Sequence, residues 1–314
     1  MEQSKILKHV LEKAGNANLI YELVEKLSPS EMVTLLLALS KEIAAKNAPS
    51  DIVSKYRTNR FVKPSGLDPV QVKQIEISML QLAKTMGFSP ILLSPASLLG
   101  SCSTIAQVDQ NNVVSATRGL ELISDSTNML AIYLADGLKN KTMDNTRNFI
   151  HLAAVSRVTR GQMFKEKHFV PHFGLFAMVS SGKDSGSYGF EKAAILKHIG
   201  FYIRYFGEQP GHQLQVYLNA RKGYTDRAGL LLRLQSGLEE NYPGIDIVLN
   251  QTETDNRYYQ GVNFKVSVDD IPIIDGGFVD WTQKLLNNKK ERLLISGAGI
   301  DLQIVAGIVK EKYI

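Results

Sequence analysis

The sequence predicts an α+β protein, with an antiparallel sheet flanked by helices and a small helical unit in front of it. Through residues 1–60, apolar side chains recur at helical spacing and strand-forming residues are few. After Pro69 the chain alternates between helical and strand-like segments. Residues 261–268 and 271–274 flank Asp269-Asp270 in the pattern of a β-hairpin. Hairpin strands with helices packed against them favour an antiparallel sheet over a doubly wound parallel one.

The first unit is predicted to be all helical and to end near residue 60. Ser28 is a typical N-cap, Pro29 suits the first helical position, and Glu31 completes a capping box. These residues predict a helix over residues 29–45, which the segment around Pro49 ends. A basic connector then leads onward, so we expect two domains, residues 1–60 and residues 61–314.

The second domain is predicted to open with a long helix over residues 69–86, ended by Gly87. A short strand over residues 91–93 is expected between two prolines. Periodicity predicts the other elements before the hairpin: helices over residues 126–138 and 190–206, and strands over residues 149–156, 173–180 and 213–218.

The composition excludes several classes of protein. The 36 basic and 31 acidic side chains leave a net charge of only +5, which does not mark a nucleic-acid binder, so tRNA is not expected as a partner. Apolar stretches fall short of the roughly 20 residues of a membrane helix, and the N-terminal residues lack a signal peptide's apolar core. The single cysteine, Cys102, fits a reducing compartment, so we expect a cytoplasmic protein. No metal-ligand spacing is present, and no metal site is predicted.

Six segments, in order, resemble the catalytic core of class II aminoacyl-tRNA synthetases of the histidyl type. The resemblance covers about residues 66–309. It implies the family's antiparallel core and a homodimer formed through the first segment. The segments are residues 69–95, like the first motif; 122–127, like a Leu-Arg-Pro-Glu/Asp-x-Thr loop; 149–178, like the second motif; 258–264, like Tyr-Tyr-x-Gly-x-x-Phe; 275–280, like Gly-Gly-Arg-Tyr-Asp; and 297–301, like the start of the third motif.

The resemblance implies a pocket for an amino-acid-like ligand. Asp125 and Thr127 stand in the loop that binds the substrate's amino group, although Asp125 would equally serve as the N-cap of the next helix. Arg157 would grip a phosphate or carboxylate, or else form a salt bridge on its strand. His172 would contact the ligand, or else be a hydrogen-bonded core residue. The remaining candidates for ligand binding are Tyr258, Tyr259, Gly276, Gly277, Gly297 and Gly299.

Two structural expectations follow for these candidates. Side chains alternate along a strand, so only one of Tyr258 and Tyr259 should face the pocket. Gly276 and Gly277 should allow the backbone to be approached closely beside that tyrosine.

The charged residues with which the family handles ATP are replaced in this chain. Leu302 stands at the arginine of the third motif, and Thr159 stands at the glutamate of the second. Phe176, Thr254 and Phe278 occupy three more charged positions. A neutral side chain cannot make the charge-assisted contact that stabilises phosphate, so we expect ATP to bind weakly or not at all.

These features favour a non-catalytic synthetase paralogue that binds a small amino-acid-like ligand or a partner protein, and no catalytic residue is assigned. Residues 302–314 leave no room for an anticodon-binding domain, which makes the chain similar to the regulatory subunit of ATP phosphoribosyltransferase. One alternative is an enzyme that adenylates an amino acid or another carboxylate for a non-tRNA acceptor; only this alternative calls for ATP and Mg²⁺ as cofactors. The other alternative is a structural subunit whose pocket is filled by its own side chains.

Overall fold

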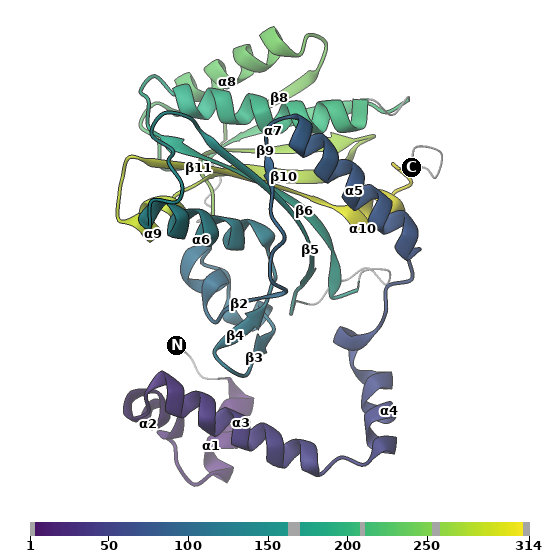
Figure 1. Cartoon of the computed structure of the whole chain (residues 1–314), viewed down its shortest axis with the longest axis vertical. Helices are drawn as coiled ribbons and strands as arrows, with labels where there is room; N and C mark the ends of the chain where they lie inside the picture. Colours follow the sequence, from purple (N-terminus) through teal and green to yellow (C-terminus); the bar gives the residue numbers. More distant parts are fainter. Residues whose placement is uncertain (1–3, 163–169, 208–210, 253–257, 310–314) are drawn as a thin grey trace.

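The computed structural model describes residues 4–162, 170–207, 211–252 and 258–309, and its centre is a large mixed sheet. Within these residues eight strands form the sheet in the order β1-β5-β6-β11-β10-β9-β7-β8 (Figure 1). The pairs from β5 to β7 are antiparallel, and the two edge strands β1 and β8 pair in parallel. The strands are β1 (Ser89–Pro90), β5 (Ile150–Thr159), β6 (His172–Lys183), β7 (Leu214–Ala220), β8 (Asp246–Asn250), β9 (Gln260–Val268), β10 (Ile271–Val279) and β11 (Glu291–Gly299).

Helices cover both faces of this sheet, which gives the α+β layers that the sequence predicts (Figure 1). Helices α5 (Pro69–Thr85), α7 (Gly189–Gly207) and α8 (Arg227–Asn241) bury one face around Phe176, Phe201 and Phe264. Helices α6 (Ser126–Lys139) and α9 (Trp281–Leu286) bury the other face around Leu134, Val179 and Ile295. Each strand supplies both layers because successive side chains point to opposite faces. Helix α10 (Ile300–Val305) follows β11 and contacts α5.

The predicted hairpin is confirmed, and it is longer than expected. Ile271 pairs with Val268 across the turn, and β10 continues to Val279 rather than ending at Ile274. Asp269 and Asp270 both adopt positive φ, 50° and 64°, as a two-residue hairpin turn of this hand requires.

The strand predicted over residues 91–93 is absent from the described chain. Only Ser89 and Pro90 pair with β5, after which the amide of Ile91 donates to the carbonyl of Ala153 at 2.8 Å and the chain leaves the sheet. The chain then forms a separate small sheet in the order β2-β4-β3. Its elements are β2 (Ala96–Leu98), β3 (Ser115–Ala116) and β4 (Leu120–Leu122), with the helical turns η2 (Ser101–Ile105) and η3 (Gln110–Asn112) between β2 and β3.

The N-terminal helices lie apart from the main sheet (Figure 1). Helix α3 has the predicted bounds, Pro29–Ala45, and its capping box is confirmed: the Ser28 amide donates to the Glu31 carboxylate at 2.8 Å, and the Glu31 amide donates to Ser28 Oγ at 3.4 Å. The other helices of this part are α1 (Lys5–Lys13), α2 (Leu19–Lys26), α4 (Pro49–Thr58) and the short η1 (Arg60–Val62).

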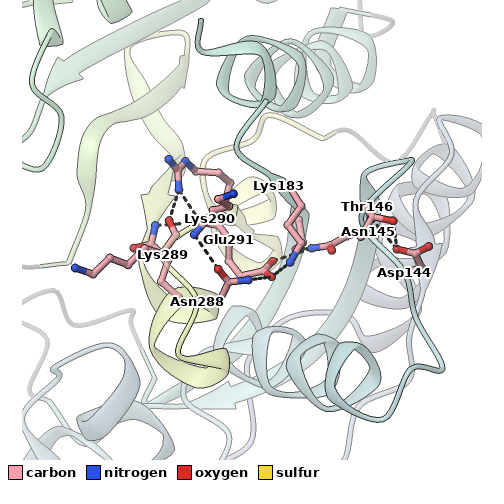
Figure 2. A network of polar contacts seen from close by, with 11 residues as sticks. Asp144, Asn145, Thr146, Lys183, Asn288, Lys289, Lys290 and Glu291 are labelled. Atoms are coloured by element: carbon pink, nitrogen blue, oxygen red, sulfur yellow. Dashed lines mark hydrogen bonds and ion pairs between the residues drawn. The ribbon is translucent and has the colours of Figure 1, made fainter. Parts of the chain in front are cut away.

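A buried carboxylate joins three segments at one end of the sheet (Figure 2). Glu291, the first residue of β11, is 1% exposed and forms an ion pair with Lys183 at the end of β6. Its carboxylate also accepts from Asn145 at 2.9 Å and from Asn288 at 3.1 Å. Because the charge is both paired and hydrogen-bonded, this network stabilises the sheet and needs no external ligand.

A second polar network crosses the core between β5, β6, α7 and β11. Ser180 Oγ lies 2.6 Å from His151 Nδ1 and 2.8 Å from His198 Nε2. His198 Nδ1 lies 2.8 Å from Ser296 Oγ, which lies 3.0 Å from the Tyr202 hydroxyl. Burial lowers the pKa of His151 to about 4 and lowers the pKa of His198 well below its ordinary range, so both imidazoles are neutral in the folded protein near pH 7.

Candidate functional site

A cavity of about 960 Å³ is lined by residues of α6, of the strands β6, β10 and β11, and of α10. Its wall combines the first turn of α6, the residues before β9, and the junction of β11 with α10. Residues 65–67, from the connector ahead of α5, close one side. Six of the ten candidate residues line the cavity: Asp125, Thr127, Tyr258, Tyr259, Gly297 and Gly299.

Asp125 has two roles at this wall. Its Oδ1 accepts from the amide and the hydroxyl of Thr127, at 2.8 and 2.7 Å, which caps α6 as one interpretation of the sequence expected. Its Oδ2 accepts from the Tyr258 hydroxyl at 3.1 Å on the cavity side. One oxygen of the carboxylate therefore holds the helix, while the other is part of the cavity wall.

Both tyrosines line the cavity, so the expectation that only one of them faces it is wrong. Tyr258 and Tyr259 precede β9, which begins at Gln260, and the alternation of a strand does not apply to them. Their rings meet edge to face with centroids 4.7 Å apart. Burial is the larger cause, and the negative charge of the neighbouring carboxylates the smaller one, that raises the pKa of each hydroxyl well above its ordinary range. Both hydroxyls therefore remain protonated and can donate hydrogen bonds.

Asp275 completes the polar end of the cavity, and sequence reasoning did not single it out. Its carboxylate accepts from the Tyr259 hydroxyl at 2.7 Å and from Asn263 Nδ2 at 3.3 Å. Burial raises the pKa of this carboxyl. The sequence does contain a signal for it, since Asp275 opens the segment that resembles Gly-Gly-Arg-Tyr-Asp.

The two glycines of β10, Gly276 and Gly277, do not line the cavity, but each leaves room for a neighbouring aromatic ring. A Cβ on Gly277 would lie 2.6 Å from the Tyr259 ring, and one on Gly276 would lie 2.5 Å from the Phe264 ring. The close approach expected at these positions is thus made by aromatic rings, one of them a cavity residue.

Arg157 and His172 lie outside the residues that line the cavity. Arg157 donates to Asp301 Oδ2 at 3.0 Å and to His172 Nδ1 at 2.8 Å. The Nε2 of His172 lies 2.6 Å from the carbonyl oxygen of Lys63, to which it donates. Asp301 also accepts from the Gly174 amide at 2.7 Å. Both candidates therefore tie β5 and β6 to α10 and to the connector.

At three of the five positions where the family has a charged residue, this chain has an apolar side chain. Leu302 lines the cavity where the resemblance would place an arginine. Phe176 and Phe278 are fully packed in the core on the opposite face of the sheet. Thr159 ends β5 opposite His172, and Thr254 lies outside the described residues.

A thiol with polar neighbours forms a further part of the wall that the sequence did not indicate. Cys102 Sγ lies 2.8 Å from Ser124 Oγ and accepts from Asn128 Nδ2 at 3.0 Å. Burial raises the pKa of the Cys102 thiol, which keeps it protonated. These residues come from η2, from the segment before α6 and from α6 itself, so no local pattern links them.

The cavity has a small excess of acidic side chains. Asp125, Asp275 and Asp301 face it, with Arg160 and Lys265 as its basic residues. Among the described residues no group of three or more histidine, cysteine, aspartate or glutamate side chains is arranged to hold a metal ion. Nor does any helix in the described part of the chain have the length and apolar character to span a membrane.

Comparison with protein-family models and with curated protein sequences gives no match. Solved structures do match. The ATP phosphoribosyltransferase regulatory subunit/histidyl-tRNA synthetase of Bacillus halodurans aligns with a TM-score of 0.61 and 15% identity, over 78% of this chain and 83% of that one. Apo histidyl-tRNA synthetase of S. aureus aligns with a TM-score of 0.60 and 12% identity, over 81% and 71%.

A third structure, the histidine–tRNA ligase subunit of Alicyclobacillus acidocaldarius, aligns with a TM-score of 0.55 and 9% identity, over 76% of this chain and 95% of that one. At such identities the likeness concerns the fold, and it agrees with the order of motifs in the sequence. The chain has the class II aminoacyl-tRNA synthetase-like fold that histidyl-tRNA synthetases and the ATP phosphoribosyltransferase regulatory subunit share.

Proposed function

We propose that the protein is a non-catalytic, synthetase-like subunit that binds a small amino-acid-like ligand carrying a cationic nitrogen. The observation that carries this proposal is the pairing at the polar end of the cavity. Two tyrosine rings in contact each direct a hydroxyl to a different carboxylate, Tyr258 to Asp125 and Tyr259 to Asp275. Partly desolvated carboxylates beside a cavity favour a cationic partner, which restores the charge balance lost on burial.

The cavity volume supports ligand binding over the structural alternative. About 960 Å³ lies at the upper end of the range of small-molecule sites, and the wall combines apolar surface with a few convergent polar groups. A pocket filled by its own side chains would leave no such volume.

The arginine left from the second motif gives little support to the adenylating alternative. Arg157 is committed to Asp301 and His172, and Leu302 offers the cavity an apolar surface where triphosphate would need a cation. We therefore propose no ATP or Mg²⁺ requirement. We further propose that the protein contacts a partner protein, because one of its structural neighbours is described as a regulatory subunit. A cytoplasmic location and a homodimer are also proposed, the first from the single cysteine and the second from the likeness of residues 69–95 to the first motif.

Calorimetric titration of the full chain with each amino acid and with ATP tests the proposal. We expect one amino acid or a close analogue to bind and ATP not to bind. The Asp125→Asn variant keeps the shape and the cap of α6 but removes the charge, so ligand affinity should fall about 10- to 100-fold, the effect of ~1.5 to 3 kcal/mol for a hydrogen bond to a charged group.

The matched control is Asp136→Asn, which removes a charge from an exposed position of the same helix and should leave affinity unchanged. Micromolar ATP binding, or ATP–pyrophosphate exchange with any amino acid, would instead favour the adenylating enzyme. Equal affinity in both variants would contradict the role given to Asp125.

A further inference from the structure

The N-terminal helices expose far more apolar surface than they bury. In the described part of residues 1–60, Leu11 alone is buried, at 4% exposure. By contrast eleven large apolar side chains of α1 to α4 are exposed, from 38% at Leu36 to 78% at Ile6. The full set is Ile6, Val10, Ile20, Tyr21, Val24, Leu36, Leu39, Ile43, Ile52, Val53 and Tyr56.

Taken together, these eleven side chains expose about as much apolar area as one partner buries in a standard protein–protein interface. Burying one such side chain corresponds to roughly 60 to 120 Å² of apolar surface, so at about half exposure the eleven present on the order of 500 Å². A standard interface covers about 800 Å² on each partner, of which a little over half is apolar. The eleven side chains are spread over α1 to α4, and three of them, Leu36, Leu39 and Ile43, lie on α3.

The longest apolar stripe runs along α3. Met32, Leu36, Leu39 and Ile43 are spaced by four, three and four residues, the spacing of a coiled-coil seam. The spacing of these four residues is the same from either end of the helix, with its midpoint between Leu37 and Ala38. Reversing α3 therefore superposes the stripe on itself.

We infer that α3 is an assembly surface whose partner is the α3 of a second copy, packed antiparallel about a two-fold axis. A two-fold contact requires a surface that is complementary to itself, and the symmetric stripe meets this requirement by placing Met32 against Ile43 and Leu36 against Leu39 of the other copy. Antiparallel helices also align their dipoles favourably. Residues 1–60 hold nine basic and seven acidic side chains, so two copies meet without strong repulsion. The inference does not depend on the ligand cavity, nor on the dimer contact expected through α5.

Disulfide trapping tests the contact in the full chain. The native thiol, Cys102, is buried at 3% exposure, so an introduced cysteine on α3 is the reactive one. We expect an equimolar mixture of Leu36→Cys and Leu39→Cys proteins to form a cross-linked heterodimer at least ten times faster than a mixture of Leu36→Cys with Lys41→Cys. Lys41 lies on the opposite side of α3, about 200° around the helix from Leu39. Equal rates in the two mixtures, or no cross-link in either, would overturn the inference.

Sedimentation equilibrium gives a second readout that does not rely on thiols. In the Leu39→Glu/Ile43→Glu variant the association constant of α3-mediated assembly should fall at least tenfold. The control variant Lys41→Glu/Ala45→Glu has the same four-residue spacing on the opposite side of α3 and should not lower it. All four positions are exposed, so neither variant disturbs a packed core. A wild-type mass of 34.8 kDa at micromolar concentration would overturn the inference in favour of another protein as the occupant of the stripe.

Discussion

The buried histidine network predicts that the protein loses stability as the pH falls below neutrality. His151 and His198 share Ser180 as a hydrogen-bond partner, and His198 is fully buried. Burial, with the positive charge of Lys197 nearby, lowers the pKa of His151 to about 4 from the ordinary 6.5. In the unfolded chain both imidazoles take up a proton near pH 6.5, whereas in the folded chain they do not.

The sign and the size follow from proton linkage. Between pH 6.5 and about 4 the unfolded state binds the extra proton, so the free energy of unfolding falls as the pH is lowered. Each histidine removes up to about 1.4 kcal/mol per pH unit in this window. His151 is only half-buried, so we expect it to contribute about 2 kcal/mol after solvent screening. Asp275 acts in the opposite direction, because its raised pKa means that the folded state holds its proton more firmly.

Urea unfolding at a series of pH values from 4.5 to 8 measures the effect, and His151→Gln isolates it. The difference in unfolding free energy between wild type and His151→Gln should be constant above pH 7 and should change by about 2 kcal/mol in favour of the variant as the pH falls to 4.5. His9→Gln, at an exposed position of α1, is the matched control and should run parallel to wild type throughout. A His151→Gln curve that also runs parallel to wild type would refute the reasoning, as would an imidazole NMR titration of His151 with its midpoint near 6.5.

Three further predictions concern residues around the sheet. Asp125→Ala removes the cap of α6 and should lower the free energy of unfolding by about 1 kcal/mol, whereas Asp125→Asn should change it by no more than about 0.5 kcal/mol. Thermal unfolding measures both, and equal losses in the two variants would contradict the capping geometry. Gly277→Ala should displace the Tyr259 ring, at a cost of about 1 to 3 kcal/mol and with weaker ligand binding, while Gly207→Ala, which meets open space, should be neutral in both assays. Glu291→Ala should lower the free energy of unfolding by about 1 to 3 kcal/mol, because buried Asn145 loses its hydrogen-bond acceptor while Lys183, which is 33% exposed, can be solvated. Ligand affinity per folded molecule should persist, and lost affinity would couple this network to the cavity.

Local patterns predicted the elements of the fold well but not their pairing. Helix α3 and the β9–β10 hairpin are specified by residues close in sequence, through the Ser28–Glu31 capping box and the Asp269-Asp270 turn. The partner of β11 on one side is β6, more than a hundred residues earlier, and no periodicity encodes that pairing. The short strand was misplaced because apolar residues 91–93 resemble a buried strand, while only Ser89 and Pro90 pair.

The candidate site was predictable where a motif carried it. Asp125, Thr127 and Tyr258 were found through their segments, and the structure brings them together in the cavity. Tyr259 lines the cavity together with Tyr258 because β9 begins at Gln260, after both tyrosines, so the alternation of a strand does not apply to them. Cys102 and Asn128 were missed because their contact joins residues 26 positions apart that no motif links.

The position of β11 has a consequence for the order in which the protein matures during synthesis. It lies in the interior of the main sheet, between β6 and β10, yet among the strands that the structure describes it is the last to be translated (Figure 1). Until residues 291–299 leave the ribosome, β6 and β10 each present an unpaired edge in the middle of the future sheet. The nascent chain therefore exists as two half-sheets with open edges, the form of intermediate most exposed to mispairing and to chaperone capture. Completion of the core is a late event that a single nine-residue strand triggers.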